Sequence, residues 1–460
     1  MGGLEAAVAP FSELERTWRI DAEYFKKEFL ATKEELEPLE KRHVAALTHV
    51  SDGNHFTISE DFVDEGIPYY RGQDVVGHFF VESAAPNFIT EEAYNRKYMK
   101  RSHLKKGDVL LSIVGTIGEL SLVDTDAPAT CSCKLAILRP QSVEPEVLAT
   151  FLQSKYGRNQ VKRLTRGAIQ GSLLLEDMDQ LWVPKWATML PKKIAATVQE
   201  SRNHSVLVRK NTEKAEALLF EALGLANWAP PEPLTYSASS VDAFASGRLD
   251  AQFFAPRIQQ LIDHLSGAGR ALGDIATPRR EKFDAAKHGD FDYIQIGDLD
   301  GNGTTASSRV SAEEAASRAS WFVRPGDVIT STVRPIRRLS AQIAADQDGF
   351  VCSSGFVVLA PTRVQPELLL TYLRLPVICE LMDLFASASM YPAISEADIL
   401  TLPAPVVDTA TEQAVVSAVR ESRAARSRSY ALLDAAKRAV EIAIEDSEAS
   451  ALAYLDNLEA

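Results

Sequence analysis

The sequence is poor in the residues that build disulfide frameworks and metal sites. Its 460 residues include only four cysteines and eight histidines. So few cysteines in a chain of this size indicate a reducing compartment rather than a disulfide-bonded protein. Cys131 and Cys133 have no neighbouring Cys or His to complete a zinc site, so we interpret them as small strand residues. The histidines are scattered singly, and we expect no metal site.

Long apolar runs are also missing. No stretch approaches the roughly 20 apolar residues that a membrane helix requires. The N-terminus, MGGLEAAVAP, lacks the basic start and apolar core of a secretory signal. We therefore expect a cytoplasmic protein that has no membrane partner.

Familiar catalytic and cofactor motifs are absent from the sequence. It contains no G-x-x-x-x-G-K-[ST], no G-x-G-x-x-G after a strand, and no H-E-x-x-H, G-x-S-x-G or C-x-x-C. The single Pro-Pro pair, Pro230-Pro231, does not follow the Asn or Asp of an adenine-methyltransferase active site. We therefore predict no catalytic residues and no cofactor bound by this chain.

Positive charge is in deficit overall, because 49 basic residues face 63 acidic ones and the formal net charge is −14. This balance counts against a nucleic-acid binder that works by general charge attraction, since neutralising phosphates requires Lys and Arg. It does not exclude a binder whose basic residues are concentrated on one surface.

What the sequence does contain is a long internal repeat. Six segments recur in the same order at offsets of 219 to 229 residues, which chance does not explain. The most evident pairs are Arg19-Ile-Asp-Ala-Glu-Tyr-Phe25 with Arg248-Leu-Asp-Ala-Gln-Phe-Phe254, and Leu104-Lys-Lys-Gly-Asp-Val-Leu110 with Val323-Arg-Pro-Gly-Asp-Val-Ile329. The chain is therefore predicted to be a tandem duplication of a unit of about 220 residues.

Each copy is predicted to end in a long helix, over 191–223 and over 412–444. Apolar and small residues recur at alternating spacings of four and three, as in helices that pack lengthwise against each other. The apolar seam residues are Ile194, Val198, Val208, Ala215 and Leu219 in the first helix, and Val415, Val419, Leu433, Ala436 and Val440 in the second. Ser201 and Ser205 make the seam half polar, and Arg426 adds a charge that we expect to be solvated. At 1.5 Å per residue, 33 residues span roughly 50 Å.

The residue patterns outside the long helices predict an α+β fold. We expect a helix over 11–46, then short strands at 56–58, 67–70, 108–114, 120–123 and 135–138, a helix over 145–156, a basic loop, and a strand before Pro184. The predicted parts are a first globular domain (1–189), its helix (190–225), a linker (226–246), a second globular domain (247–408), its helix (409–446) and a C-terminal tail (447–460).

Basic and amide side chains gather in the predicted loops of both copies. Arg with Gln or Asn can read base edges bidentately, whereas Lys mainly holds phosphates. The candidate DNA-binding residues are Arg71, Gln73, Lys97, Lys100, Arg101, Lys162, Arg163, Arg166 and Gln170 in the first copy, and Arg279, Arg280, Gln295, Arg334, Arg337, Arg338 and Tyr391 in the second. Any single cluster could equally be a solvated face. The framework matches between the copies while these residues differ, as expected of two readers of two different sequences.

The chain has a duplicated domain-plus-helix plan, and it contains the run Gly107-Asp-Val-Leu-Leu-Ser-Ile-Val-Gly-Thr-Ile-Gly118 with a weaker repeat, Gly326-Asp-Val-Ile-Thr-Ser-Thr-Val-Arg-Pro335. In these features it resembles a specificity subunit of a type I restriction-modification system or of a related methylation-based phage-defence system. The resemblance implies two target-recognition domains that each bind half of a split site in double-stranded DNA. It also implies two antiparallel long helices that pair as a coiled coil and set the gap. The subunit would lack catalysis and recruit two methyltransferase subunits, which would bind S-adenosylmethionine and could in turn engage motor-nuclease subunits.

Two other functions stay open at the level of the sequence. One is a protein–protein scaffold built from two tandem binding domains, which the acidic balance would suit. The other is a divergent enzyme whose active site is split between the copies, although no repeated histidine or carboxylate constellation supports it.

Overall fold

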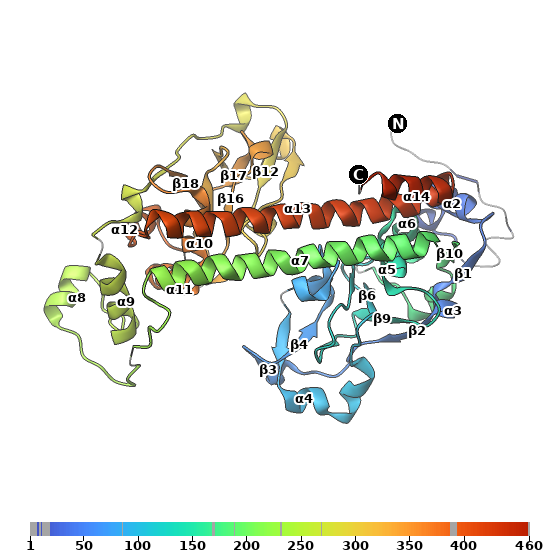
Figure 1. The fold of residues 1–460 in the computed structure, drawn as a ribbon, viewed down its shortest axis with the longest axis horizontal. Coiled ribbons are helices and arrows are strands. Elements are labelled where there is room, and N and C mark those ends of the chain that lie inside the picture. The colour runs from blue at the N-terminus through green and yellow to red at the C-terminus, as the bar shows by residue number, and fades with distance from the viewer. Residues whose placement is uncertain are drawn as a thin grey trace. The chain divides into compact units, whose positions relative to one another are not determined.

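The computed structural model describes residues 7–8, 11, 19–84, 86–167, 171–187, 189–230, 232–267, 269–386 and 393–458. Its chain divides into two compact units, residues 1–206 with 425–460 and residues 207–424. The division crosses two long helices, α7 (Met189–Ala222) and α13 (Thr409–Glu445), drawn in green and red in Figure 1. Each unit therefore combines one globular body with part of both long helices.

The first unit carries short helices around short strands. Its described helices before α7 are α2 (Lys27–Leu36), α3 (Val44–Leu47), α4 (Glu91–Asn95), α5 (Pro145–Gln153) and α6 (Lys155–Leu164), and α14 (Glu448–Asp456) follows α13. Its strands are β1 (Lys41–His43), β2 (Thr48–Asp52), β3 (Phe62–Val63), β4 (Ile67–Tyr70), β5 (Asn87–Ile89), β6 (Val109–Ser112), β7 (Leu120–Leu122), β8 (Thr130–Cys131), β9 (Leu135–Pro140) and β10 (Trp182–Pro184).

Two four-stranded sheets form the body of the first unit. One is antiparallel with the order β2-β9-β6-β7, and the other has the order β3-β5-β4-β8 with β4 and β8 parallel. Val109 and Leu111 of β6 pack in the core that includes α5 and α6, whereas Leu110 between them packs in a core with Tyr70 and Cys131 of the other sheet. Because both faces of β6 are buried, its sequence is a continuous apolar run rather than an alternating one.

The second unit repeats this plan. Its helices besides the long ones are α8 (Ser240–Ser246), α9 (Pro256–Ser266), α10 (Pro366–Arg374), α11 (Pro376–Phe385) and α12 (Glu396–Thr401). Its strands are β11 (Ala276–Pro278), β12 (Phe291–Ile294), β13 (Ser308–Val310), β14 (Ala319–Phe322), β15 (Val328–Ser331), β16 (Ser340–Gln342), β17 (Val351–Ser353) and β18 (Phe356–Pro361).

Strand order and register show the duplication directly. The sheet β11-β18-β15-β16 repeats β2-β9-β6-β7, and in it Val328 is opposite Leu359 as Val109 is opposite Leu138. In the other sheet, β12 runs parallel to β17 as β4 runs parallel to β8. Only the outer strand differs, because β3 extends the first copy beyond β5 while β14 extends the second beyond β17. The predicted α+β tandem duplication is confirmed.

The two long helices lie side by side and antiparallel (Figure 1). In the first unit Ser201 of α7 is hydrogen-bonded to Ser429 of α13, and in the second unit Thr212 of α7 is hydrogen-bonded to Ser422 of α13. Residue numbers therefore rise along α7 as they fall along α13. The predicted seam residues Ile194, Val198, Val208, Ala215, Leu219, Val415, Leu433, Ala436 and Val440 are buried, and Val419 is half-buried. Arg426 is also half-buried, and its guanidinium donates to the Tyr430 hydroxyl on its own helix at 3.1 Å.

Three sequence-based expectations about the first unit are wrong. The helix expected over 11–46 ends at Leu36, Pro38 follows, and strand β1 occupies part of the remainder; residues 12–18 lie outside the described part. Residues 56–58 form no strand. The basic loop expected after 156 is helix α6.

Gly157 explains why α6 was not recognised in the sequence. Glycine weakens a helix, so its presence counts against a helical prediction for this segment. A Cβ at this position would lie 2.3 Å from the Phe151 carbonyl oxygen, so the close approach of α5 requires glycine here. A tertiary contact therefore selects a residue that argues locally against the helix.

Candidate nucleic-acid interface

In the first unit, three loops meet beyond the end of β6. They are residues 71–75, 113–118 and 165–173, of which 168–170 lie outside the described part; we call them the first loop cluster. The Thr116 hydroxyl donates to the Gly72 carbonyl at 2.9 Å, which joins the first two loops. The Leu173 amide donates to the Ile113 carbonyl at 2.9 Å, which adds the third.

The equivalent loops meet in the second unit. They are residues 295–299, 332–338 and the described residues 393–394, and we call them the second loop cluster. The Ile394 amide donates to the Thr332 carbonyl at 2.9 Å, and the Thr332 hydroxyl donates to the Gly355 carbonyl at 3.0 Å. A Cβ at Gly355 would lie 2.7 Å from the Ile296 side chain, so this glycine lets the remaining loop pack closely.

The two loop clusters contain about half of the candidate residues. Arg71, Gln73 and Arg166 lie in the first cluster, and Gln295, Arg334, Arg337 and Arg338 lie in the second. Gln170 and Tyr391 lie outside the described residues. The other candidates lie elsewhere: Lys97, Lys100 and Arg101 on the 3-10 helix η5 (Lys97–Ser102), Lys162 and Arg163 at the end of α6, and Arg279 and Arg280 after β11.

Several candidate arginines bind carboxylates within their own domain. Arg279 forms a bidentate pair with the buried Asp327, at 2.6 and 2.9 Å, and these hydrogen bonds raise the pKa of its guanidinium. The first copy matches this pair with Arg139 and the buried Asp108, both contacts at 2.7 Å. The Asp of each repeated Gly-Asp motif is thus neutralised by an arginine, which comes from the adjacent strand β9 in the first copy and from the end of β11 in the second.

Other candidate arginines hold the loops in place. Arg166 pairs with the buried Asp177 at 2.6 Å; burial raises the pKa of this carboxyl, and Arg166 acts against the increase. Arg163 donates to the Tyr24 carbonyl at 3.1 Å, and its guanidinium lies 4.2 Å from the centre of the Tyr24 ring. Arg338 donates to the Arg374 carbonyl at 2.6 Å and pairs with Glu216.

Two further candidates pair at the surface. Arg101 pairs with Asp52, and Arg280 pairs with Glu396 at 2.5 Å. By contrast, Gln73, Lys97, Lys100, Lys162, Gln295, Arg334 and Arg337 are exposed. Exposed candidates without a carboxylate partner can contact an external phosphate or base without first breaking an internal pair.

The repeated Arg-x-Asp motif has a role that sequence reasoning did not assign. Arg19 pairs with Asp21 and donates to the Leu164 carbonyl at 3.1 Å at the end of α6. Arg248 pairs with Asp250 and donates to the Leu384 carbonyl at 2.9 Å near the end of α11. In both copies the motif therefore caps a helix C-terminus. The recurrence of this motif in both copies is the sequence feature from which a structural role could have been predicted.

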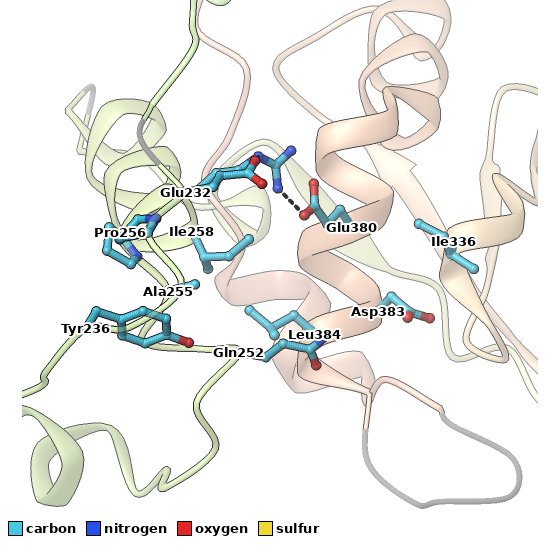
Figure 2. Close-up of a pocket in the computed structure, with 12 residues that line it drawn as sticks. Glu232, Tyr236, Gln252, Ala255, Pro256, Ile258, Ile336, Glu380, Asp383 and Leu384 are labelled. Carbon is cyan, nitrogen blue, oxygen red and sulfur yellow. Dashed lines mark hydrogen bonds and ion pairs between the residues drawn. The ribbon is translucent and has the colours of Figure 1, made fainter. Parts of the chain in front are cut away.

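The second unit also contains a cavity of about 370 Å³, shown in Figure 2. Glu232 comes from the linker after α7, Glu380 and Asp383 come from α11, and Ile336 comes from the second loop cluster. Arg257 pairs with both Glu232 and Glu380. Three carboxylates against one guanidinium leave the wall acidic, so it is unsuited to a DNA phosphate.

The described residues contain no group of three His, Cys, Asp or Glu side chains placed to hold a metal ion. Burial raises the pKa of the Cys131 thiol, and it raises that of Cys352 to about 12. Both thiols are therefore protonated at neutral pH and act as small apolar strand residues. Within the described ranges, no helix is both long and apolar enough to cross a membrane.

Comparison with known proteins shows that the sequence is similar to a specificity subunit of a type I restriction enzyme. The chain is 24% identical over 153 residues to the specificity subunit of the type I restriction enzyme HindI of Haemophilus influenzae. The resemblance predicted from the sequence is confirmed. The match covers 32% of this chain and about a third of the relative's length, 33%. No protein-family profile matches the chain.

Solved structures with similarity to the chain come from the same kind of system. The S subunit of the type I restriction-modification system from M. genitalium is 14% identical, covering 90% of this chain and 95% of its own, with a TM-score of 0.36. The HsdS subunit from Thermoanaerobacter tengcongensis is 15% identical, covering 89% and 96%, with a TM-score of 0.27. A chain from a structure of type I R-M complex assembly is 17% identical, covering 91% and 96%, with a TM-score of 0.28.

Proposed function

We propose that this chain is the DNA-recognition subunit of a type I restriction-modification system or a related methylation-based defence system. One observation carries the proposal: the same sheet scaffold occurs twice, with equivalent loop clusters that present different polar side chains. A shared scaffold with different loops suits two domains that read two different sequences. The sequence similarity to a type I specificity subunit supports the same function.

In this proposal, residues 1–189 and 247–408 are the two target-recognition domains, and each binds one half of a bipartite site in double-stranded DNA. The helices at 190–225 and 409–446 set the gap between the half-sites, 226–246 is the linker and 447–460 is the tail. Arg and Gln in the loop clusters read base edges, while exposed lysines such as Lys97 and Lys100 hold phosphates.

The chemistry belongs to partner subunits. Two methyltransferase subunits bind S-adenosylmethionine and methylate adenine, and motor-nuclease subunits can join them for restriction. The target adenine has to be flipped out of the duplex into the partner's pocket, because the methylating site cannot reach a stacked base. The chain described here supplies recognition and assembly without catalysis.

Selection from a random DNA library tests this function. The chain is assembled with a type I methyltransferase subunit that forms a complex with it, and bound or methylated fragments are sequenced. We expect a motif in two parts separated by an unspecified gap. Recovery of DNA without a two-part motif would contradict the proposal, and so would a complex that binds only proteins, which is the outcome expected of a scaffold.

A domain exchange tests the two-reader arrangement. Residues 47–183 are replaced by the equivalent domain of another such subunit, while residues 247–408 stay unchanged. We expect one half of the motif to change and the other to persist. A change in both halves would show that the domains do not read independently.

A further inference from the structure

Arg71 and Gln295 occupy the same position in the two copies. Arg71 directly follows β4 and is the N-cap of the 3-10 helix η3 (Gly72–Val75). Gln295 directly follows β12 and is the N-cap of η9 (Ile296–Asp298). Their backbone angles agree closely, with φ −121° and ψ 167° at Arg71 and φ −106° and ψ 167° at Gln295. Two side chains of different chemistry therefore leave the scaffold in the same direction.

The hydrogen bonds around the two residues also match. The Arg71 amide donates to Asp74 at 2.8 Å, and the Gln295 amide donates to Asp298 at 2.8 Å. The preceding strand pairs in parallel with its neighbour in both copies. The backbone is thus fixed by identical contacts, and the side chain is the variable part.

Asp74 also orients the Arg71 side chain. The guanidinium donates from Nε to Oδ2 and from Nη2 to Oδ1, both at 3.2 Å. Of the five N–H groups that a guanidinium carries, this pairing uses two along one edge. The opposite edge keeps both Nη1 hydrogens and one Nη2 hydrogen, and the Arg71 side chain is 34% exposed. A held guanidinium with one free edge fits the O6 and N7 acceptors of guanine.

Gln295 presents the complementary chemistry. Its side chain is exposed, and its amide offers one donor and one acceptor side by side. That pair fits N7 and N6 of adenine, which a guanidinium cannot match because it has no acceptor. Two residues further on, Gln73 of the first copy corresponds to Gly297, so that position lacks a polar side chain in the second copy.

We propose that Arg71 and Gln295 are equivalent specificity-determining residues, with Arg71 reading a guanine in one half-site and Gln295 reading an adenine in the other. This inference rests on the proposed function as a DNA-recognition subunit. It goes further by assigning one scaffold position in each copy to one base pair and by naming that base.

The test exchanges the two side chains in the full complex. Wild-type chain, Arg71→Gln and Gln295→Arg are each assembled with the methyltransferase, and methylated fragments from a random library are sequenced. We expect R71Q to change one guanine to adenine in one half-site only. We expect Q295R to change one adenine to guanine in the other half-site only. Each preference should amount to about tenfold or more, the discrimination typical of a bidentate base contact.

The outcomes separate this inference from the proposed function. A two-part wild-type motif that neither exchange alters would overturn the base assignment and leave the proposed function standing. If both variants altered the same half-site, the base assignment would also be overturned. Absence of any two-part motif with the wild-type chain would contradict the proposed function itself.

Matched variants guard against loss of folding. Arg71→Lys keeps a donor for guanine, so the guanine should persist with weaker preference. Gln295 is exposed, so Q295R is expected to fold and would by itself reveal or refute the change in its half-site. Lys97→Gln removes an exposed charge outside the loop clusters and should weaken binding to all sequences alike, leaving the motif unchanged.

Discussion

At the scale of single residues, the second loop cluster contains backbone strain at arginines. Arg334 has φ +49° and Arg338 has φ +59°, whereas the equivalent hairpin of the first copy uses Gly115 and Gly118, with φ +82° and +88°. The left-handed region is unfavourable for residues with a Cβ. Arg338 is fixed there by its bonds to Arg374 and Glu216, while Arg334 is exposed. Strain retained at an exposed arginine suits a residue kept for binding.

Replacing Arg334 by glycine should therefore separate stability from function. We expect the free energy of unfolding to rise by about 1 kcal/mol, since the strain is removed, and DNA affinity to fall with a shallower salt dependence. Denaturant unfolding and DNA titrations at several salt concentrations measure the two effects. Gly115→Ala is the matched control: no atom lies near its added Cβ, so strain alone should lower stability. Equal stability of R334G and wild type would contradict the prediction.

The buried carboxylates of the Gly-Asp motifs give a paired prediction. Asp108→Asn and Asp327→Asn should each lower the free energy of unfolding by about 2 kcal/mol, because each weakens charged hydrogen bonds to an arginine. Hydrogen exchange should locate each effect in its own copy, near β6 or near β15. An effect in one copy alone would show that the two motifs are not structurally equivalent.

At the scale of elements, the pairing of α7 and α13 follows the repeat. In the first unit the Ser201 hydroxyl donates to the Ser429 carbonyl at 3.0 Å, and in the second unit the Ser422 hydroxyl donates to the Val208 carbonyl at 3.1 Å. Ser422 is the repeat equivalent of Ser201, and Ser429 is that of Val208, because both pairs are 221 residues apart in the sequence. Buried hydroxyls that need a partner favour this register over shifted ones.

Removing these hydroxyls tests the register. Ser201→Ala and Ser422→Ala should each lower the free energy of unfolding by about 1 kcal/mol, the usual loss for a buried hydrogen bond. Ser427→Ala is the control, since Ser427 lies exposed on the same helix as Ser422. Thermal or denaturant unfolding measures the change, and a Ser427 variant as unstable as the other two would contradict a specific role of the seam hydroxyls.

Helix α14 is an element that the sequence pattern presented only as a tail. Glu448 accepts hydrogen bonds from the Ala187 amide at 2.8 and 3.1 Å, just before α7 begins, and Leu455 is buried in the core of the first unit. We expect Leu455→Ala to destabilise the first unit by about 3 kcal/mol, within the range for such core truncations. Hydrogen exchange should show faster opening in β6 and α5 and unchanged protection in β15. Uniform loss across both units would be the contrary result.

At the scale of the whole molecule, net charge and local charge differ in sign. The chain carries −14 overall, yet its exposed loop-cluster residues include Arg334 and Arg337. Many other arginines are already paired with carboxylates, as Arg279 and Arg166 are. In the proposed function, DNA binding depends on a few unpaired cations, so we expect a smaller salt slope than that of a strongly basic binder.

Shortening both long helices tests whether they set the gap between half-sites. Deleting residues 203–209 and the facing residues 421–427 removes one heptad from each helix and keeps the register that pairs Ser201 with Ser429. Seven residues correspond to about 10 Å of helix, or about three base pairs. We expect the recovered gap to shorten by that amount in library selection while both half-site sequences persist. An unchanged gap would refute the role of the helices as a ruler.

Much of the architecture could be predicted because it is encoded in local or repeated patterns. The 219–229 offsets indicated two copies, and the four-three spacing indicated two long helices whose lengths agree with α7 and α13. The apolar run after Gly107 predicted a strand over 108–114, which is β6, and the structure shows that it is buried. The loop clusters could not be foreseen, because their three segments meet through contacts such as Thr116 with Gly72 that join distant parts of the chain.

The sequence by itself determined the duplication, the long helices and the resemblance to specificity subunits, since periodicity and repetition are properties of residue order. Only the tertiary structure decided which basic residues are available to a ligand. Arg279 and Arg334 look alike in the sequence, but Arg279 neutralises the buried Asp327, whereas Arg334 is exposed in the second loop cluster. The cost of burying an unpaired carboxylate, which depends on three-dimensional surroundings, assigns the arginines to these different roles.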